Sequence, residues 1–289
     1  MASYTEGNLP IAGIDVHYYR MGTRGRPPVV FLHGFSDGGL TWLRLARDLG
    51  PDYDLVMLDA AGHGKSGGVA HGFRERAASD VLAAVDQLEL ERPALVGHSM
   101  GAGTAADVAV QASARLRGVA LEDPGWWDGD SPPTLGAAPD ATGSRAPLRS
   151  PAWVDWVRSV KAMSPAERHA HADAERPQYD AETRHNWIDI KAQFNLAVLD
   201  ATSASAMRTA PPWRDTVEAI TCPILLITGD TGRGGIVTPA VAEEARRLAR
   251  DLRVANIPDV GHNIHRDNYP PYRDAVGSYL RQILALTPA

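Results

Sequence analysis

The sharpest chemical signal in the sequence is a serine between two glycines, in Gly97-His98-Ser99-Met100-Gly101. It follows a short apolar run at residues 94–96 and leads into a stretch of small residues at 101–114. A nucleophilic serine requires this strand–turn–helix context, because the sharp reversal exposes its hydroxyl above the start of a helix. Glycines on either side keep side chains from clashing across the turn. The pattern predicts Ser99 as a nucleophile.

Such a serine needs hydrogen-bond donors for the negative charge that develops on the attacked carbonyl oxygen. His33-Gly34-Phe35 follows another apolar run, residues 28–32, and ends it with a turn. Its backbone can supply one donor, and the residue after the serine can supply a second. We therefore predict an oxyanion hole made by the backbone N–H groups of Phe35 and Met100.

A general base must also reach the serine from elsewhere in the chain. His262 stands directly after the last predicted strand, residues 253–257, in Gly261-His262, so we predict it as the base. His265 lies three residues further on, and we expect a surface or capping role for it. His98 is expected to be packed or hydrogen-bonded within the serine turn.

Strand and helix patterns alternate along most of the chain. Residues 11–19 are predicted to be part of an early hairpin, and apolar strand patterns follow at 28–32, 53–58, 94–96, 118–121, 224–228 and 253–257. Helical patterns occur at 40–49, 74–90, 101–114, 239–249 and 266–284. This alternation predicts an α/β fold with a mostly parallel sheet that helices cover on both faces.

Residues 126–207 interrupt that alternation and carry no strand pattern. A Pro/Gly/Ser-rich loop at 130–151 precedes helical patterns near 152–163, 165–175 and 181–202. We predict a helical cap at 126–207, inserted after the sixth strand into a core of residues 1–125 and 208–289. Five of the seven tryptophans lie in or beside this segment and can hold it together. We predict that two of them, Trp127 and Trp187, also line an apolar pocket above Ser99.

Together these motifs resemble the α/β-hydrolase fold family, in its capped, lipase- and esterase-like branch. The resemblance spans the whole chain, with the cap its least specific part, and it implies a Ser–acid–His triad in that chain order. The motifs that carry it are His33-Gly34-Phe35, Asp59-Ala60-Ala61-Gly62-His63-Gly64-Lys65-Ser66, Gly97-His98-Ser99-Met100-Gly101 and Gly261-His262.

The acid of that triad departs from the usual family pattern. In many relatives it lies three residues after a glycine that ends the seventh strand, and here that position holds Gly232. Asp230 lies in the same loop but stands earlier. Asp123 follows the sixth strand, where some branches of the family place the acid. We favour Asp123 and keep Asp230 as the alternative, with Glu122 as a third candidate.

The motifs and the resemblance predict a serine hydrolase that cleaves a carboxylic ester or lactone of a mid-sized hydrophobic substrate through an acyl-enzyme. Carbon–carbon bond hydrolysis of a diketone and perhydrolysis would use the same triad, and a non-catalytic ligand receptor on this scaffold is a further class. No pattern indicates a cofactor or a metal. His169 and His171 suggest a metal site at first, but residues i and i+2 do not share a helix face.

Composition and charge limit the classes of molecule that this protein is expected to bind. The formal charge of −6 over 289 residues disfavours a general affinity for nucleic acid or an anionic membrane. The single cysteine, Cys222, excludes an intrachain disulfide and fits a reducing compartment. The N-terminus has no signal-peptide pattern, and no apolar run approaches the roughly 20 residues that span a membrane. We therefore expect a cytoplasmic protein that acts on a small molecule; whether it forms a homodimer is left open.

Overall fold

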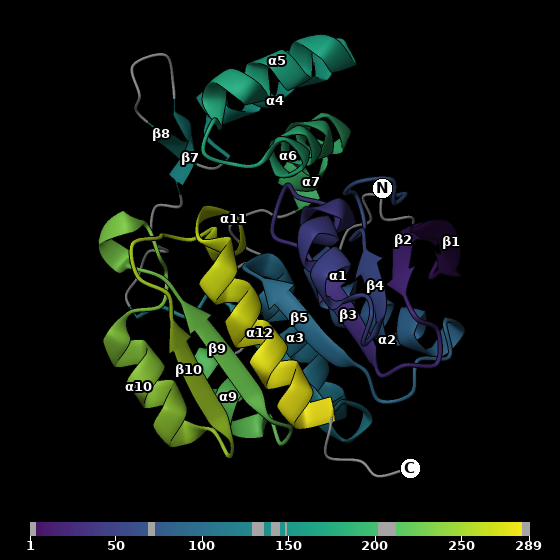
Figure 1. Ribbon diagram of the computed structural model, residues 1–289, viewed down its shortest axis with the longest axis vertical. Helices are drawn as coiled ribbons and strands as arrows, with labels where there is room; N and C mark the ends of the chain where they lie inside the picture. The colour runs from purple at the N-terminus through teal and green to yellow at the C-terminus, as the bar shows by residue number, and fades with distance from the viewer. Residues whose placement is uncertain are drawn as a thin grey trace.

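The computed structural model describes residues 4–68, 73–128, 136–139, 145–147, 149–201 and 212–284. Its centre is an eight-stranded sheet (Figure 1), built from β1 (Thr5–Ile11), β2 (Ile14–Gly22), β3 (Pro28–Leu32), β4 (Asp54–Leu58), β5 (Ala94–His98), β6 (Gly118–Glu122), β9 (Ile224–Thr228) and β10 (Leu252–Asn256). The strand order is β1-β2-β4-β3-β5-β6-β9-β10. β2 runs antiparallel to β1 and β4, and the other neighbours are parallel. The predicted mostly parallel sheet is confirmed.

Apolar residues of each central strand alternate between two separate cores, one on either face of the sheet. In β3, Val30 and Leu32 belong to one core, while Val29 and Phe31 belong to the other. Because both faces are buried, the central strands are continuous apolar runs rather than alternating ones. That is why short uninterrupted runs marked them in the sequence.

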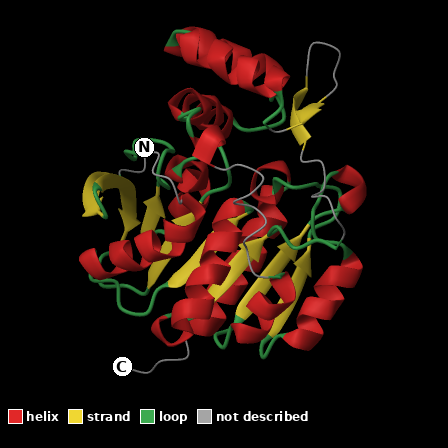
Figure 2. Cartoon of the chain, turned by 180° about the vertical axis from the view of Figure 1, so that it is seen from behind, coloured by secondary structure: helices red, strands yellow, loops and turns green. Residues whose placement is uncertain are grey.

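Helices cover both faces of the sheet, as Figures 1 and 2 show from opposite sides. One core includes residues of α2 (Phe73–Gln87), α3 (Met100–Ala112), α9 (Trp213–Ala219) and α10 (Pro239–Leu248). The other includes residues of α1 (Leu43–Leu49) and α12 (Tyr269–Leu284). Among the helices of the described ranges, none is long and apolar enough to cross a membrane.

Several predicted helices are divided in the structure, as two of them illustrate. Residues 40–49 begin as a 3₁₀ turn, η1 (Gly39–Trp42), before α1. Residues 266–284 split into a short α11 (Ile264–Asp267) and α12. Pro270 and Pro271 explain the second division, because proline fits the first turn of a helix but breaks its interior.

Helices of the predicted cap segment lie beyond one end of the sheet (Figure 1). They are α4 (Pro151–Ala162), α5 (Pro165–Glu175), α6 (Ala181–Gln193) and the short α7 (Val198–Ala201). Ser150, Ser164 and Asp180 cap the first three through their side chains, and these residue types stabilise helix N-termini. The limits of the cap as a unit, residues 126–207, stay a prediction.

One expectation for this segment was wrong, because it contains strands. β7 (Gly136–Pro139) and β8 (Arg145–Pro147) form a two-stranded antiparallel sheet. Their sequences, GAAP and RAP, contain no β-branched or aromatic residue. Backbone pairing of this kind leaves no side-chain pattern for sequence analysis to detect.

Candidate active site

Ser99 occupies the sharp turn between β5 and α3. Its φ and ψ are 52° and −111°, which a non-glycine residue rarely adopts and which costs about 1–3 kcal/mol. The backbone N–H of Ser99 donates to the carbonyl of Glu122 at 2.9 Å. The turn is thereby fixed to the end of the neighbouring strand β6, and the strained serine stays at the carboxyl end of the central strands.

The glycines on either side of this turn are required by close backbone packing. A Cβ atom on Gly97 would lie 2.3 Å from the carbonyl oxygen of Gly101, and one on Gly101 would lie 2.2 Å from that of Leu32. Real Cβ atoms do not approach so closely. Any side chain at either position would therefore separate the turn from β3 or from its own helix.

Asp123, the residue after β6, meets His262 directly. Its Oδ2 lies 2.7 Å from the His262 Nδ1 atom, and its side chain is fully buried. The backbone N–H groups of Ile236 and Val237 donate to the same carboxylate at 2.9–3.1 Å. The carboxylate is thus satisfied without water, as a buried charge requires. The Asp123 backbone is itself strained, with a φ of 42°.

Asp230, the alternative acid, is engaged elsewhere. Its Oδ2 accepts a hydrogen bond of 2.8 Å from the backbone N–H of Asp259, and its side chain is 39% exposed. Its own N–H donates to Val260. Asp230 therefore joins the loops that follow β9 and β10, which is the role of a loop carboxylate that binds backbone N–H groups.

His98 links the serine turn to the loop that carries His262. Its ring centroid lies 4.7 Å from that of His262, and its Nε2 lies 3.0 Å from the His262 carbonyl oxygen. A carbonyl can only accept, so Nε2 carries the proton. Burial lowers the pKa of His98 well below its usual value, which keeps the ring neutral. His98 is hydrogen-bonded as expected, but its partner is the His262 carbonyl rather than an atom of the serine turn.

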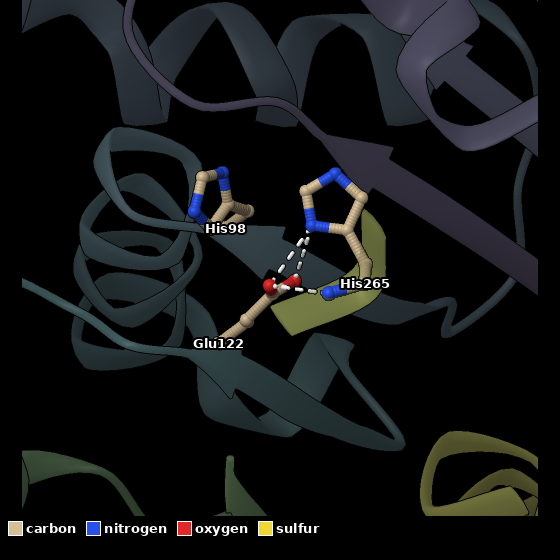
Figure 3. Close-up of side chains that lie close together, drawn as sticks. All are labelled: His98, Glu122 and His265. Atoms are coloured by element: carbon tan, nitrogen blue, oxygen red, sulfur yellow. Dashed lines mark hydrogen bonds and ion pairs between the residues drawn. The ribbon is translucent and has the colours of Figure 1, made fainter. Parts of the chain in front are cut away.

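Glu122, the residue before Asp123, forms a second carboxylate–histidine pair with His265 (Figure 3). The Nδ1 and backbone N–H of His265 donate to Glu122 Oε1 at 2.8 and 3.0 Å. Burial raises the pKa of Glu122 and lowers that of His265. We expected His265 to have a surface or capping role, and this was wrong because the residue is buried. The residue is 6% exposed, because α11 turns the loop inward against β6.

His98, Glu122 and His265 are the group of described residues whose potential metal-ligand atoms lie within 4.8 Å of one another. Figure 3 shows the His265 ring directed at the Glu122 carboxylate. The hydrogen bonds from His265 Nδ1 to Glu122 and from His98 Nε2 to the His262 carbonyl both use ring protons. A metal ion between Glu122 and the His265 Nδ1 atom would have to displace the proton that joins them, so these two residues fit a hydrogen-bonded pair better than a pair of metal ligands.

The two predicted oxyanion donors lie on neighbouring segments. Met100 is the first residue of α3, and the first N–H groups of a helix have no acceptor within it. Phe35 follows β3, which pairs with β5 so that Leu32 faces Gly97. Its ring contacts Trp153 and Phe194 of the predicted cap segment. The loop after β3 thus lies between the serine turn and the cap segment.

The two tryptophans predicted to line a pocket lie in different surroundings. Trp187 is 6% exposed and belongs to a cluster within the cap segment that includes Val160, Ala172 and Ile188. This packing fits a tryptophan that holds the cap together. Trp127 is half-buried beside Gly125. Substrate contact by either residue stays a prediction.

A cavity of about 40 Å³ lies beside the first turn of α3. Its lining combines apolar residues with polar ones, the latter being His33, Asp59, Asp80 and Thr104. This volume holds a few water molecules rather than a mid-sized substrate.

Comparisons with known proteins agree with this fold. A model of the alpha/beta hydrolase family matches residues 29–275. N-formylmaleamate deformylase of Pseudomonas putida is 29% identical over 95% of this chain and 96% of its own length. A 2-succinyl-6-hydroxy-2,4-cyclohexadiene-1-carboxylate synthase of an Enterobacter species is 32% identical, over 92% of this chain and 95% of its own. The crystal structure of an N-formylmaleamic acid deformylase from Pseudomonas putida S16 superposes with a TM-score of 0.75 at 20% identity, covering 94% of this chain and all of that one.

Proposed function

The chain belongs to the alpha/beta hydrolase family, and from this premise we propose that it is a serine hydrolase acting on a carboxylic ester or lactone. The substrate is mid-sized and hydrophobic, and the reaction passes through an acyl-enzyme. One observation carries the proposal: Asp123 and His262 are joined at 2.7 Å, and His98 of the serine turn binds the His262 carbonyl.

In the first half of the proposed reaction, His262 removes the proton from the Ser99 hydroxyl as its oxygen attacks the carbonyl carbon. The N–H groups of Phe35 and Met100 stabilise the negative charge on the carbonyl oxygen. His262 then gives the proton to the leaving alcohol oxygen as the carbon–oxygen bond breaks. Asp123 holds the Nδ1 proton and stabilises the imidazolium formed in between.

In the second half, water replaces the alcohol. His262 takes a proton from the water, whose oxygen attacks the acyl carbon of the ester formed with Ser99. The same two N–H groups hold the new oxyanion. Its collapse breaks the bond to the serine oxygen, which recovers its proton from His262, and the carboxylic acid leaves. We place the substrate between the serine turn and the cap segment, residues 126–207, where Trp127 and Trp187 are the proposed contacts.

A second candidate is removal of an N-formyl group, in which a carbon–nitrogen bond is cleaved by the same steps. The relative that is 29% identical over nearly the whole of both chains, a deformylase by name, favours it. Carbon–carbon bond hydrolysis of a diketone and perhydrolysis use the same residues. A ligand receptor without catalysis is the candidate from another class, and it would not need an activated Ser99.

A fluorophosphonate probe tests the enzymatic proposal, because it reacts covalently with an activated serine. We expect the wild-type protein to be labelled and Ser99→Ala to be unlabelled while still folded. Labelling that persists in Ser99→Ala, or its absence from folded wild type, contradicts the proposal. A panel of p-nitrophenyl esters of graded chain length, lactones and N-formyl amides then ranks the bond types by kcat/KM.

A further inference from the structure

A buried lysine of the cap segment binds the loop that carries the predicted oxyanion donor Phe35. Lys191, near the end of α6, is 7% exposed. Its Nζ donates to the carbonyl of Ser36 at 2.9 Å, to the Ser36 hydroxyl at 3.0 Å and to Asp37 Oδ1 at 2.6 Å. All three acceptors belong to the two residues that follow Phe35. The three protons of the ammonium are therefore matched by three acceptors on one short loop.

The loop needs such support because it is strained. Ser36 has a φ of 62°, a left-handed conformation that costs a non-glycine residue about 1–2 kcal/mol. The Asp37 N–H closes the turn by donating to the Gly34 carbonyl at 3.1 Å. Strained backbone persists only where its surroundings hold it. Lys191 binds the strained residue itself, through both its carbonyl and its hydroxyl.

Asp37 also connects this loop to α11, the helix that follows the proposed base His262. The guanidinium of Arg266, on α11, donates to Asp37 Oδ2 and to the Thr41 hydroxyl. Burial alone would raise the pKa of Asp37, but Arg266 and Lys191 together hold it well below its usual range. The carboxylate is therefore ionised between two cations, one from the cap segment and one from the helix that follows His262.

We propose that Lys191 is a positioning residue for the oxyanion hole: it holds the loop of residues 34–37 in the conformation that directs the Phe35 N–H at the reacting carbonyl oxygen. The cap segment would then complete the catalytic geometry of the core as well as cover the substrate. This inference rests on the proposed function, since an oxyanion hole has meaning only if Ser99 attacks a carbonyl.

The test compares wild type with Lys191→Met and Lys191→Gln. Glu182→Gln serves as the matched control, because Glu182 lies on the same helix and joins the cap segment to Arg47 of α1 by a surface ion pair. For each protein, kcat and KM are measured on the best ester of the panel. The inhibition constant of a trifluoromethyl ketone analogue is measured as well, since its adduct with Ser99 places an oxyanion in the hole. Thermal unfolding checks folding.

In the Lys191 variants we expect kcat and the affinity for the ketone to fall by the same factor, about 10- to 100-fold, with KM within about twofold. Glu182→Gln should match wild type. If Lys191→Met does not fold, the inference is judged on Lys191→Gln, because glutamine keeps an uncharged hydrogen-bond donor.

Three results overturn the inference: unchanged kcat in a folded Lys191 variant, a fall in kcat without loss of ketone affinity, or an equal loss in Glu182→Gln. Labelling of wild-type Ser99 by the fluorophosphonate distinguishes failure of the proposed function from failure of this inference alone. An unlabelled wild type rejects the proposed function and the inference together. A labelled wild type with unaffected Lys191 variants rejects only the inference.

Discussion

The Nδ1 atom of His262 lies 2.7 Å from Oδ2 of Asp123, although 139 residues separate the two in sequence. The Asp123 side chain is fully buried, whereas the His262 side chain is 12% exposed. A buried carboxylate can thus orient an imidazole whose other edge remains accessible.

The first prediction concerns Asp123, the proposed triad acid. Asp123→Asn should lower kcat by up to about 10⁴-fold, because a neutral amide neither selects the Nδ1–H tautomer nor stabilises the imidazolium. Asp230→Asn is the control and should leave kcat near wild type, since an amide oxygen can still accept from the Asp259 N–H. Steady-state kinetics on folded protein measures both. The opposite ranking would assign the acid to Asp230.

The second prediction concerns the glycines of the serine turn. Gly101→Ala should destabilise the protein by at least about 2 kcal/mol and abolish fluorophosphonate labelling, because its Cβ would meet the Leu32 carbonyl. Gly103→Ala is the matched control on the same helix, where a Cβ meets nothing within 4 Å. It should be neutral or stabilising by up to about 1 kcal/mol. Urea unfolding measures both, and equal effects would contradict the packing argument.

The third prediction concerns Glu122, the neighbour of the proposed triad acid Asp123. Glu122→Gln should lower the free energy of unfolding by about 1–3 kcal/mol, since a buried hydrogen-bond pair with His265 is weakened. Because the pair does not reach the reacting atoms, kcat should stay within about tenfold of wild type. A loss as large as that of Asp123→Asn would instead place Glu122 in the catalytic machinery.

The fourth prediction is a pH dependence of stability. Burial, followed by the nearby His33, lowers the pKa of His63 to about 3. In the unfolded chain this histidine binds a proton below about pH 6.5, whereas in the folded protein it binds one only below about pH 3. Its contribution to the free energy of unfolding is therefore fully present above pH 6.5 and is lost as the pH falls. His63→Phe cannot titrate.

The free energy of unfolding of His63→Phe should therefore fall less steeply than that of wild type between pH 6.5 and 5. The two slopes should differ by up to about 1.4 kcal/mol per pH unit. Urea titrations at several pH values measure the two slopes. Phenylalanine keeps an aromatic ring against Phe35 and Phe194, which limits other effects. Identical slopes would show that His63 is not buried neutral.

The fifth prediction separates the two tryptophans. Trp127→Ala should raise KM for hydrophobic esters with little change in kcat if its ring contacts the substrate. Trp187→Ala should chiefly lower stability, by about 3–5 kcal/mol, because its ring is buried in the cap segment. Steady-state kinetics and thermal unfolding of both variants distinguish substrate contact from a structural role. A change confined to KM in Trp187→Ala would place its ring at the substrate instead.

Local sequence determined most of the fold. The apolar strands, the helices and the serine turn at Ser99 depend on residues close together in the chain, and their positions were predicted to within a few residues. The missed strands, β7 and β8, have short sequences of small residues and proline, whose pairing depends on backbone hydrogen bonds. The break between α11 and α12 was missed although Pro270 and Pro271 mark it.

By itself, the sequence determined which residue types are available for chemistry: a serine in a glycine turn, a histidine after the last strand, and several carboxylates. Only the tertiary structure decided which carboxylate meets His262, because Asp123 and Asp230 are equally suitable as residues and differ only in where their loops converge. The burial of His265 against Glu122 and the reach of Lys191 to Ser36 were undetectable for the same physical reason. Each contact joins residues more than 100 positions apart, and no periodicity or local propensity encodes such a distance.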